Sequence, residues 1–207
     1  MKAKTLLILF LGVLLFGCSE SEDTKRLLSI DHKMNNGQYD IVIREGQKYV
    51  QDYPNSFKGW NQLGWAYLKT DQLQEAEQCF NRSININDSW DNAYVGRGGL
   101  YRKMGKLHEA RINYQKAISL LPDNAEAFSS LLVIELMDGN DEKAVEYGEK
   151  AWALRKDLPS IPANLAIAYH YLDNPKKRDE FYRHAKNLGY HNLQSIDAII
   201  EGNATVK

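Results

Sequence analysis

Residues 57–90 read FKGWNQLGWAYLKTDQLQEAEQCFNRSININDSW, and residues 91–124 read DNAYVGRGGLYRKMGKLHEARINYQKAISLLPDN. The two segments have equal length and carry residues of the same kind at matching positions. The matching pairs are Trp60 with Tyr94, Gly64 with Gly98, Tyr67 with Tyr101, Ala76 with Ala110, and Phe80 with Tyr114. The same period of 34 residues continues on both sides, so five units fill residues 23–192.

Each unit holds two apolar stripes separated by a short turn. Apolar residues three and four positions apart share one face of a helix, so each unit predicts two helices. The turn residues also keep the period: Gly37, Asp71, Gly105, Gly139 and Asp173. One such helix pair cannot bury its own apolar face, and neighbouring pairs must therefore stack into an array. Small residues such as Ala76 and Ala110 would let the helices approach closely.

The layout W-x2-L-G-x2-Y…A-x3-F…P resembles the tetratricopeptide repeat (TPR) family. The resemblance implies an all-α fold, an α-solenoid of about five helix-turn-helix units that forms a right-handed superhelix with a concave groove. The expected units are 23–56, 57–90, 91–124, 125–158 and 159–192. After them, residues 193–207 predict a short capping helix, because open arrays need a polar outer end, followed by a frayed tail.

The first residues predict a targeting segment. Lys2 and Lys4 precede an apolar run from Thr5 to Phe16, which is too short for a membrane-spanning helix of about 20 residues. The sequence Leu15-Phe16-Gly17-Cys18 resembles the lipobox of bacterial lipoproteins. The resemblance implies that residues 1–17 are a signal peptide and that Cys18 is acylated, followed by an acidic tether through residue 22. An ordinary signal peptide with an incidental cysteine is the alternative.

By the same resemblance, the protein would be lipid-anchored in the bacterial cell envelope. The expected place is the outer membrane, with the repeats facing the periplasm or the cell surface. Several acyl chains on Cys18 would hold the protein on the membrane stably.

Composition limits the partners. Without Lys2 and Lys4, 24 basic residues stand against 27 acidic ones, a net charge of about −3. A nucleic-acid partner would need a basic stripe, so none is expected. Cys79 would be the only cysteine left if Cys18 carries lipid, and its place among core residues predicts a small buried hydrophobe.

The sequence contains no recognisable catalytic motif, and we expect neither an enzyme nor a cofactor. His170, His184 and His191 lie near one another in sequence, but no familiar ligand spacing accompanies them, so no metal site is expected. An envelope enzyme or metal-binding protein that uses this histidine-rich end remains an alternative, as does a purely structural spacer.

Function on such a scaffold belongs to the concave face, which in the TPR family is lined by first helices. Carried to this sequence, the candidate partner-binding residues are Lys58, Asn61, Trp65, Lys69, Asn92, Arg102, Lys103, Glu126, His170 and Tyr171. Trp, Tyr and Arg dominate binding energy at interfaces. Trp65 either anchors a partner or packs between adjacent units. The cations Lys58, Lys69, Arg102 and Lys103 make the middle of the predicted groove basic.

We therefore expect a membrane-anchored scaffold or adaptor that binds another envelope protein. The basic groove predicts that the bound segment is acidic and either extended or helical.

Overall fold

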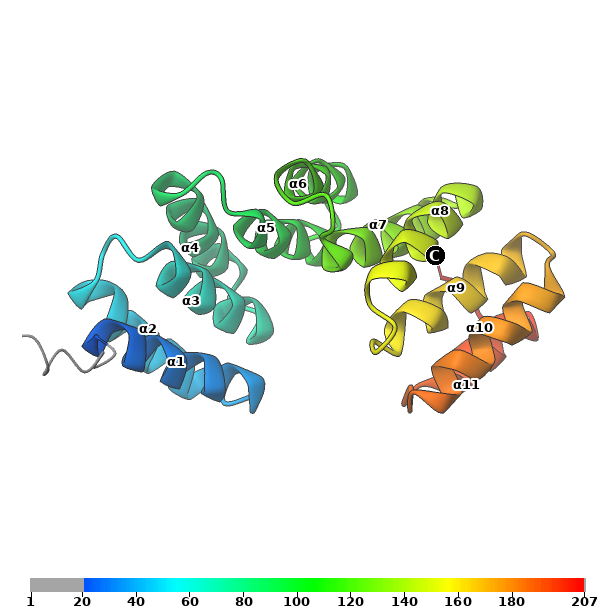
Figure 1. Cartoon of the computed structure of the whole chain (residues 1–207), viewed down its shortest axis with the longest axis horizontal. Helices are drawn as coiled ribbons and strands as arrows, with labels where there is room; N and C mark the ends of the chain where they lie inside the picture. The colour runs from blue at the N-terminus through cyan, green and yellow to red at the C-terminus, as the bar shows by residue number, and fades with distance from the viewer. Residues whose placement is uncertain (1–20, 207) are drawn as a thin grey trace, which may run out of the picture.

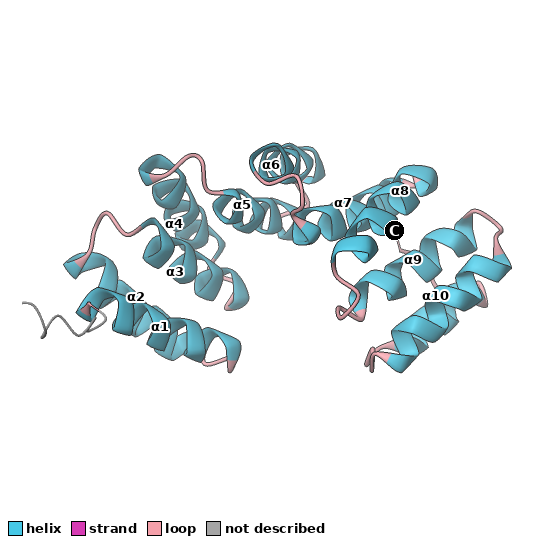
Figure 2. Cartoon of the chain, in the orientation of Figure 1, coloured by secondary structure: helices cyan, strands magenta, loops and turns pink. Residues whose placement is uncertain are grey.

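The computed structural model describes residues 21–206, and every regular element within that range is an α-helix (Figures 1 and 2). The helices form five consecutive antiparallel pairs and one final helix. The pairs are α1 (Glu22–Asn35) with α2 (Tyr39–Asp52), α3 (Phe57–Lys69) with α4 (Leu73–Ile86), α5 (Asp91–Lys103) with α6 (Leu107–Leu120), α7 (Ala125–Asp138) with α8 (Asp141–Leu154), and α9 (Ser160–Tyr171) with α10 (Pro175–Asn187). The last helix is α11 (Leu193–Ile200). The expected all-α solenoid is confirmed.

The turns inside the pairs follow the period that the sequence predicted. Gly37, Gly105 and Gly139 have φ values of 70–73°, and Asp71 and Asp173 have φ values of 63° and 49°. A left-handed residue ends a helix by turning the chain back, a conformation that glycine adopts without steric cost and that aspartate tolerates. All five turns thus use one backbone conformation, which keeps the offset between successive pairs regular.

Small residues allow the two helices of a pair to touch. A methyl group added at Gly98 of α5 would lie 2.8 Å from the ring of Tyr114 in α6, and one at Gly64 of α3 would lie 2.9 Å from the ring of Phe80 in α4. Ala76 and Ala110 are fully buried, as the sequence pattern predicted. Each large ring is therefore accommodated by a missing side chain on the partner helix.

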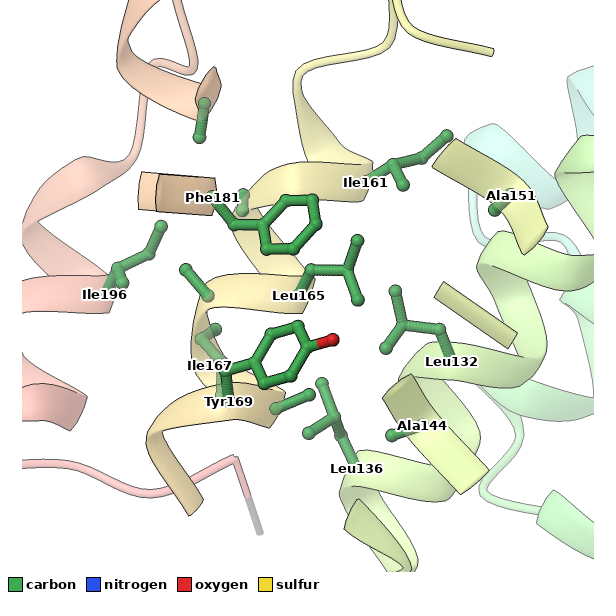
Figure 3. Packing of buried hydrophobic residues seen from close by; sticks show 14 of the residues in the cluster. Leu132, Leu136, Ala144, Ala151, Ile161, Leu165, Ile167, Tyr169, Phe181 and Ile196 are labelled. Carbon is green, nitrogen blue, oxygen red and sulfur yellow. The ribbon is translucent and has the colours of Figure 1, made fainter. Parts of the chain in front are cut away.

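The core runs through the whole array. Buried residues form three clusters, and partly buried side chains join them: Trp65 packs against the first two along the chain, and Ile118 and Tyr147 pack against the second and third. In the C-terminal cluster, side chains from α7, α8, α9, α10 and α11 converge around Leu165 (Figure 3). Each pair thus buries its apolar face only against its neighbours, as a stacked array requires.

One buried carboxylate interrupts the apolar packing. Glu135, near the end of α7, is only 2% exposed. Arg111 of α6 donates its Nε–H to Glu135 Oε1 at 2.9 Å, and Asn140 donates to Oε2 at 2.8 Å. Arg111 also pairs with Asp138. The buried charge is therefore fully partnered across the interface between the third and fourth pairs.

The start of the array differs from expectation in one detail. Helix α1 begins at Glu22, inside the expected tether, because the Ser21 side chain accepts the N–H of Thr24 as an N-terminal cap. At the other end, α11 covers α9 and buries Ile196, which is the expected capping arrangement. In the tail beyond it, the Val206 N–H donates to the Tyr171 hydroxyl at 3.3 Å, and the expected fraying stays a prediction.

The expected signal peptide and Cys18 lie outside the described residues. Within residues 21–206, no helix is both long enough and apolar enough to cross a membrane.

Candidate partner-binding groove

The first helices of the pairs form the inner side of the array. Each second helix packs against the first helix of the next pair, and successive first helices also contact one another: α1 with α3, α3 with α5, α5 with α7, and α7 with α9. Figure 1 shows the result as an arch, with α6 on its outer side and α5 and α7 further in. Successive second helices of the described residues have no comparable contact with one another, so the stack curves toward the first helices, which gives a concave face.

A groove of about 510 Å³ lies on this inner side. Its walls come from four successive first helices and from the starts of α2 and α5. The lining residues are Asp31, Met34, Asn35, Tyr39, Asn61, Gln62, Trp65, Lys69, Trp90, Asn92, Val95 and Glu126. The lining combines aromatic surface, amides and charges of both signs, which suits a polypeptide better than a purely apolar ligand.

Half of the residues that the sequence singled out come together in this groove. They are Asn61, Trp65, Lys69, Asn92 and Glu126. Lys58 does not line the groove but lies beside it on α3, where its charge acts on the carboxylate of Asp31. The role of these residues in binding stays a prediction.

Arg102 and Lys103 do not line this groove, and their role in binding a partner stays a prediction. The Lys103 ammonium pairs with Asp71 at 2.5 Å and donates to the Leu68 carbonyl at 3.3 Å, so it lies at the turn that follows α3. Arg102 is exposed near the Tyr114 hydroxyl and is not part of the groove lining. These two cations were the main reason to expect an acidic partner segment, and the groove lacks them.

His170 and Tyr171 also lie apart from this groove, on α9 near the C-terminal end. Their rings contact one another at 5.5 Å, and the Tyr171 hydroxyl accepts the N–H of Val206. The returning tail thus occupies part of the surface that the family template assigned to a partner.

Several lining residues were not predicted from the sequence, because they lie at helix ends. Trp90 directly precedes α5, and Tyr39 is the first residue of α2. A template that uses only the bodies of first helices cannot find them. Their large aromatic side chains in polar, exposed segments were the available signal.

Asn61 is the most informative residue of the groove. It is 4% exposed, and its Oδ1 atom has no hydrogen-bond partner among the described residues. A buried polar atom without a partner costs about 1–3 kcal/mol. Protein interiors rarely tolerate such an atom, so its position in the wall of a groove points to a ligand that supplies the missing donor.

Trp65 packs between adjacent units and also lines the groove, and its role as an anchor for a partner stays a prediction. Its ring packs edge-on against Phe80 at 5.7 Å, and it lies 3.4 Å from where a side chain at Gly99 would begin, so it fills the contact between units. It also lines the groove, where the Lys69 ammonium lies 6.0 Å from its ring centre. The exposed part of the ring is therefore accessible to a cation.

Two carboxylates lie in the groove. Desolvation raises the pKa of Glu126, opposed by the positive charges of Lys69 and Arg155. The Glu126 side chain still reaches solvent, so the cause is the concave wall around it rather than complete burial. Desolvation likewise raises the pKa of Asp31, which accepts a hydrogen bond from Gln62. Ionised carboxylates in such surroundings favour an added cation.

The histidines do not form a metal centre in the described part of the chain. His184 lies against the rings of Trp152 and Phe181, and His191 lies against Tyr190. No group of three or more His, Cys, Asp or Glu side chains within residues 21–206 could hold a metal ion. Cys79 is buried, and burial raises the pKa of its thiol to about 12, so it is an unreactive core residue.

Comparison with known proteins identifies the repeat. A family model described as tetratricopeptide repeat matches residues 57–90, and one described as TPR repeat matches residues 98–131. The first match spans α3 and α4, and the second runs from within α5 to within α7. The chain therefore contains tetratricopeptide repeats, as its period predicted.

Parts of longer proteins are similar to this chain in sequence, and solved structures share its fold. Human protein O-mannosyl-transferase TMTC3 is 30% identical over 129 residues, which cover 61% of this chain and 14% of that protein. A thermophilic TPR protein of Thermus thermophilus has a TM-score of 0.73 at 18% identity, covering 86% of this chain and 98% of that one. Pseudomonas aeruginosa pilF has a TM-score of 0.75 at 16% identity, and the match covers 87% of this chain and 85% of that one. The chain spans only 6–18% of the length of the curated relatives it matches.

Proposed function

We propose that this protein is a lipid-anchored adaptor of the bacterial cell envelope that binds a segment of another protein in the groove between α1 and α7. Its TPR fold suggests a scaffold for protein–protein interaction. The envelope location, in the outer membrane and facing the periplasm or the cell surface, rests on the sequence of the first 18 residues.

The observation that carries the binding function is the unpartnered, buried Oδ1 atom of Asn61 in the groove wall. An extended or helical segment brings backbone and side-chain N–H donors, which can satisfy this atom. A purely structural spacer gains nothing from a buried oxygen left without a donor, and for that reason we favour the adaptor.

The anchor can be tested at Cys18. The thiol accepts the first acyl group, so Cys18→Ala should abolish incorporation of a radioactive fatty acid and block cleavage of the signal peptide before residue 18. The helical circular dichroism spectrum should not change, because residue 18 precedes the repeats. Ser19→Ala serves as the control and should still label. Labelling of Cys18→Ala would refute the lipid anchor.

The groove can be tested by photo-crosslinking in cells. Benzoylphenylalanine in place of Asn92, which is exposed in the groove wall, should yield a covalent adduct with a partner protein. The same group in place of Ile112, which is 50% exposed on the outer helix α6, should yield none. A discrete adduct from Ile112 alone would place the binding surface outside the groove.

A further inference from the structure

We propose that the groove recognises a protein segment with a basic side chain, lysine or arginine, whose cation lies between Glu126 and the aromatic surfaces of Trp65 and Trp90. The inference rests on the proposed function, because it names the kind of segment that the groove binds. It replaces the acidic segment that the sequence alone predicted.

The charges of the groove lining favour a cation. The groove wall contains the carboxylates Asp31 and Glu126 and one cation, Lys69. Gln62 donates a hydrogen bond to Asp31, and Lys58 lies near enough to act on its charge. The Glu126 side chain has no hydrogen bond or ion pair with another residue of the described chain. The charges of Lys69 and Arg155 act on it only at longer range. Glu126 is thus the lining carboxylate that is left open to a ligand, and the ligand group that complements it is a cation.

The position of the Lys69 ammonium also indicates where a cation would lie. Its ammonium lies over the ring of Trp65 and acts electrostatically on Glu126. In the free protein, this lysine therefore occupies the kind of position that an arriving cation would take. Its side chain is exposed and flexible, so it can move aside when a better placed cation arrives.

The amide side chains of the groove can form hydrogen bonds with the backbone of the same segment. Asn61 needs a donor, and Asn92 and Gln62 lie in the same lining. A backbone N–H next to the basic residue would satisfy Asn61 Oδ1, while the two tryptophans cover the aliphatic part of the side chain. Together these features recognise a peptide with a cation, whereas an acidic peptide would place like charges against Glu126 and Asp31.

Three immobilised synthetic peptide pools can test the inference. All have the same length and random uncharged flanks, and the central residue is arginine, glutamine or glutamate. Full-length protein in nonionic detergent should bind the arginine pool at least about tenfold more tightly than the glutamate pool, which is ~1.4 kcal/mol. Glu126→Gln should remove most of this preference. Glu142→Gln, an equal change of charge at an exposed site on α8, should leave it intact.

Lys69→Gln distinguishes a basic bound segment from an acidic one, because the two should respond to this change in opposite directions. Removing the internal cation should strengthen binding of the arginine pool, because Lys69 competes for Glu126 and Trp65. An acidic ligand would instead bind this variant more weakly. Melting curves of the variants, followed by circular dichroism, should match that of the wild type, since positions 69 and 126 are exposed.

Asn61→Leu separates a role of Asn61 in binding from a role in stability, because the two roles predict different effects on the melting temperature. It should weaken binding of the arginine pool while the melting temperature stays equal or rises, because the unpartnered oxygen is gone. Preferential binding of the glutamate pool would overturn the basic-segment inference and leave the groove as a binding site. Failure of every pool to bind would overturn both the inference and the proposed groove function.

Discussion

Arg111→Met should lower the free energy of unfolding by about 3–5 kcal/mol, because it leaves the carboxylate of Glu135 buried without its counter-charge. Glu135 is 2% exposed, and of its two donors only Asn140 would remain. The ion pair joins α6 to α7, so the loss should separate the third repeat from the fourth rather than stay local. Urea unfolding followed by circular dichroism measures the effect.

The double variant Arg111→Met with Glu135→Met distinguishes a stranded charge from lost packing. Replacing both members of a buried ion pair by apolar residues of similar volume is often neutral or stabilising, so the double variant should recover most of the stability. Arg82→Met, at an exposed site on α4, controls for loss of one positive charge and should change little. A double variant as unstable as the single one would show that the pair is not the cause.

Gly96→Ala should destabilise the protein by roughly 1–3 kcal/mol although alanine is the better helix former. The new methyl group would lie 2.3 Å from Cε1 of Phe80. That ring is fully buried and packs against Trp65, and on its own repeat it lies 2.9 Å from where a Cβ at Gly64 would stand, so it has no room to move. The clash therefore acts at the contact between the second and third repeats.

Gly99→Ala is a matched control on the same helix. Its methyl group would lie 3.4 Å or more from Trp65 and Leu68, an ordinary contact, so only the gain in helix propensity remains. We expect Gly99→Ala to leave the thermal midpoint unchanged or to raise it, while Gly96→Ala lowers it. Equal midpoints for the two variants would show that Phe80 is not confined as described.

Much of the fold could be predicted from the period alone. A residue that starts a left-handed turn recurs every 34 positions, and Asp71 and Asp173 adopt the same positive φ as the glycines they replace. The small residues facing Phe80 and Tyr114 were also visible, because their type recurs at a fixed place in each unit. These features depend on local spacing, which a sequence displays directly.

The groove could be predicted only in part, since its details depend on contacts between distant residues. Helix position places Lys103 on an inner helix, but its long side chain reaches Asp71 instead. The unpartnered oxygen of Asn61 results from everything that surrounds it, and no local pattern records it. Trp90 contributes from a helix end, outside the positions that a first-helix template covers.

The returning tail has a similar explanation. Polar, glycine-containing ends usually fray, and nothing in residues 202–206 indicates otherwise. The contact of Val206 with Tyr171 depends on the place where α11 ends relative to α9. That place follows from tertiary packing and not from the tail itself.

The central claim is that the inner groove binds a protein segment. The most direct measurement is calorimetric titration of the segment recovered from the Asn92 crosslink against wild-type protein and two bulky variants. Asn92→Trp fills the groove from an exposed position and should weaken binding at least about tenfold. Ile112→Trp adds the same bulk on the outer helix α6 and should bind like the wild type. Equal affinity of Asn92→Trp and wild type would contradict the claim.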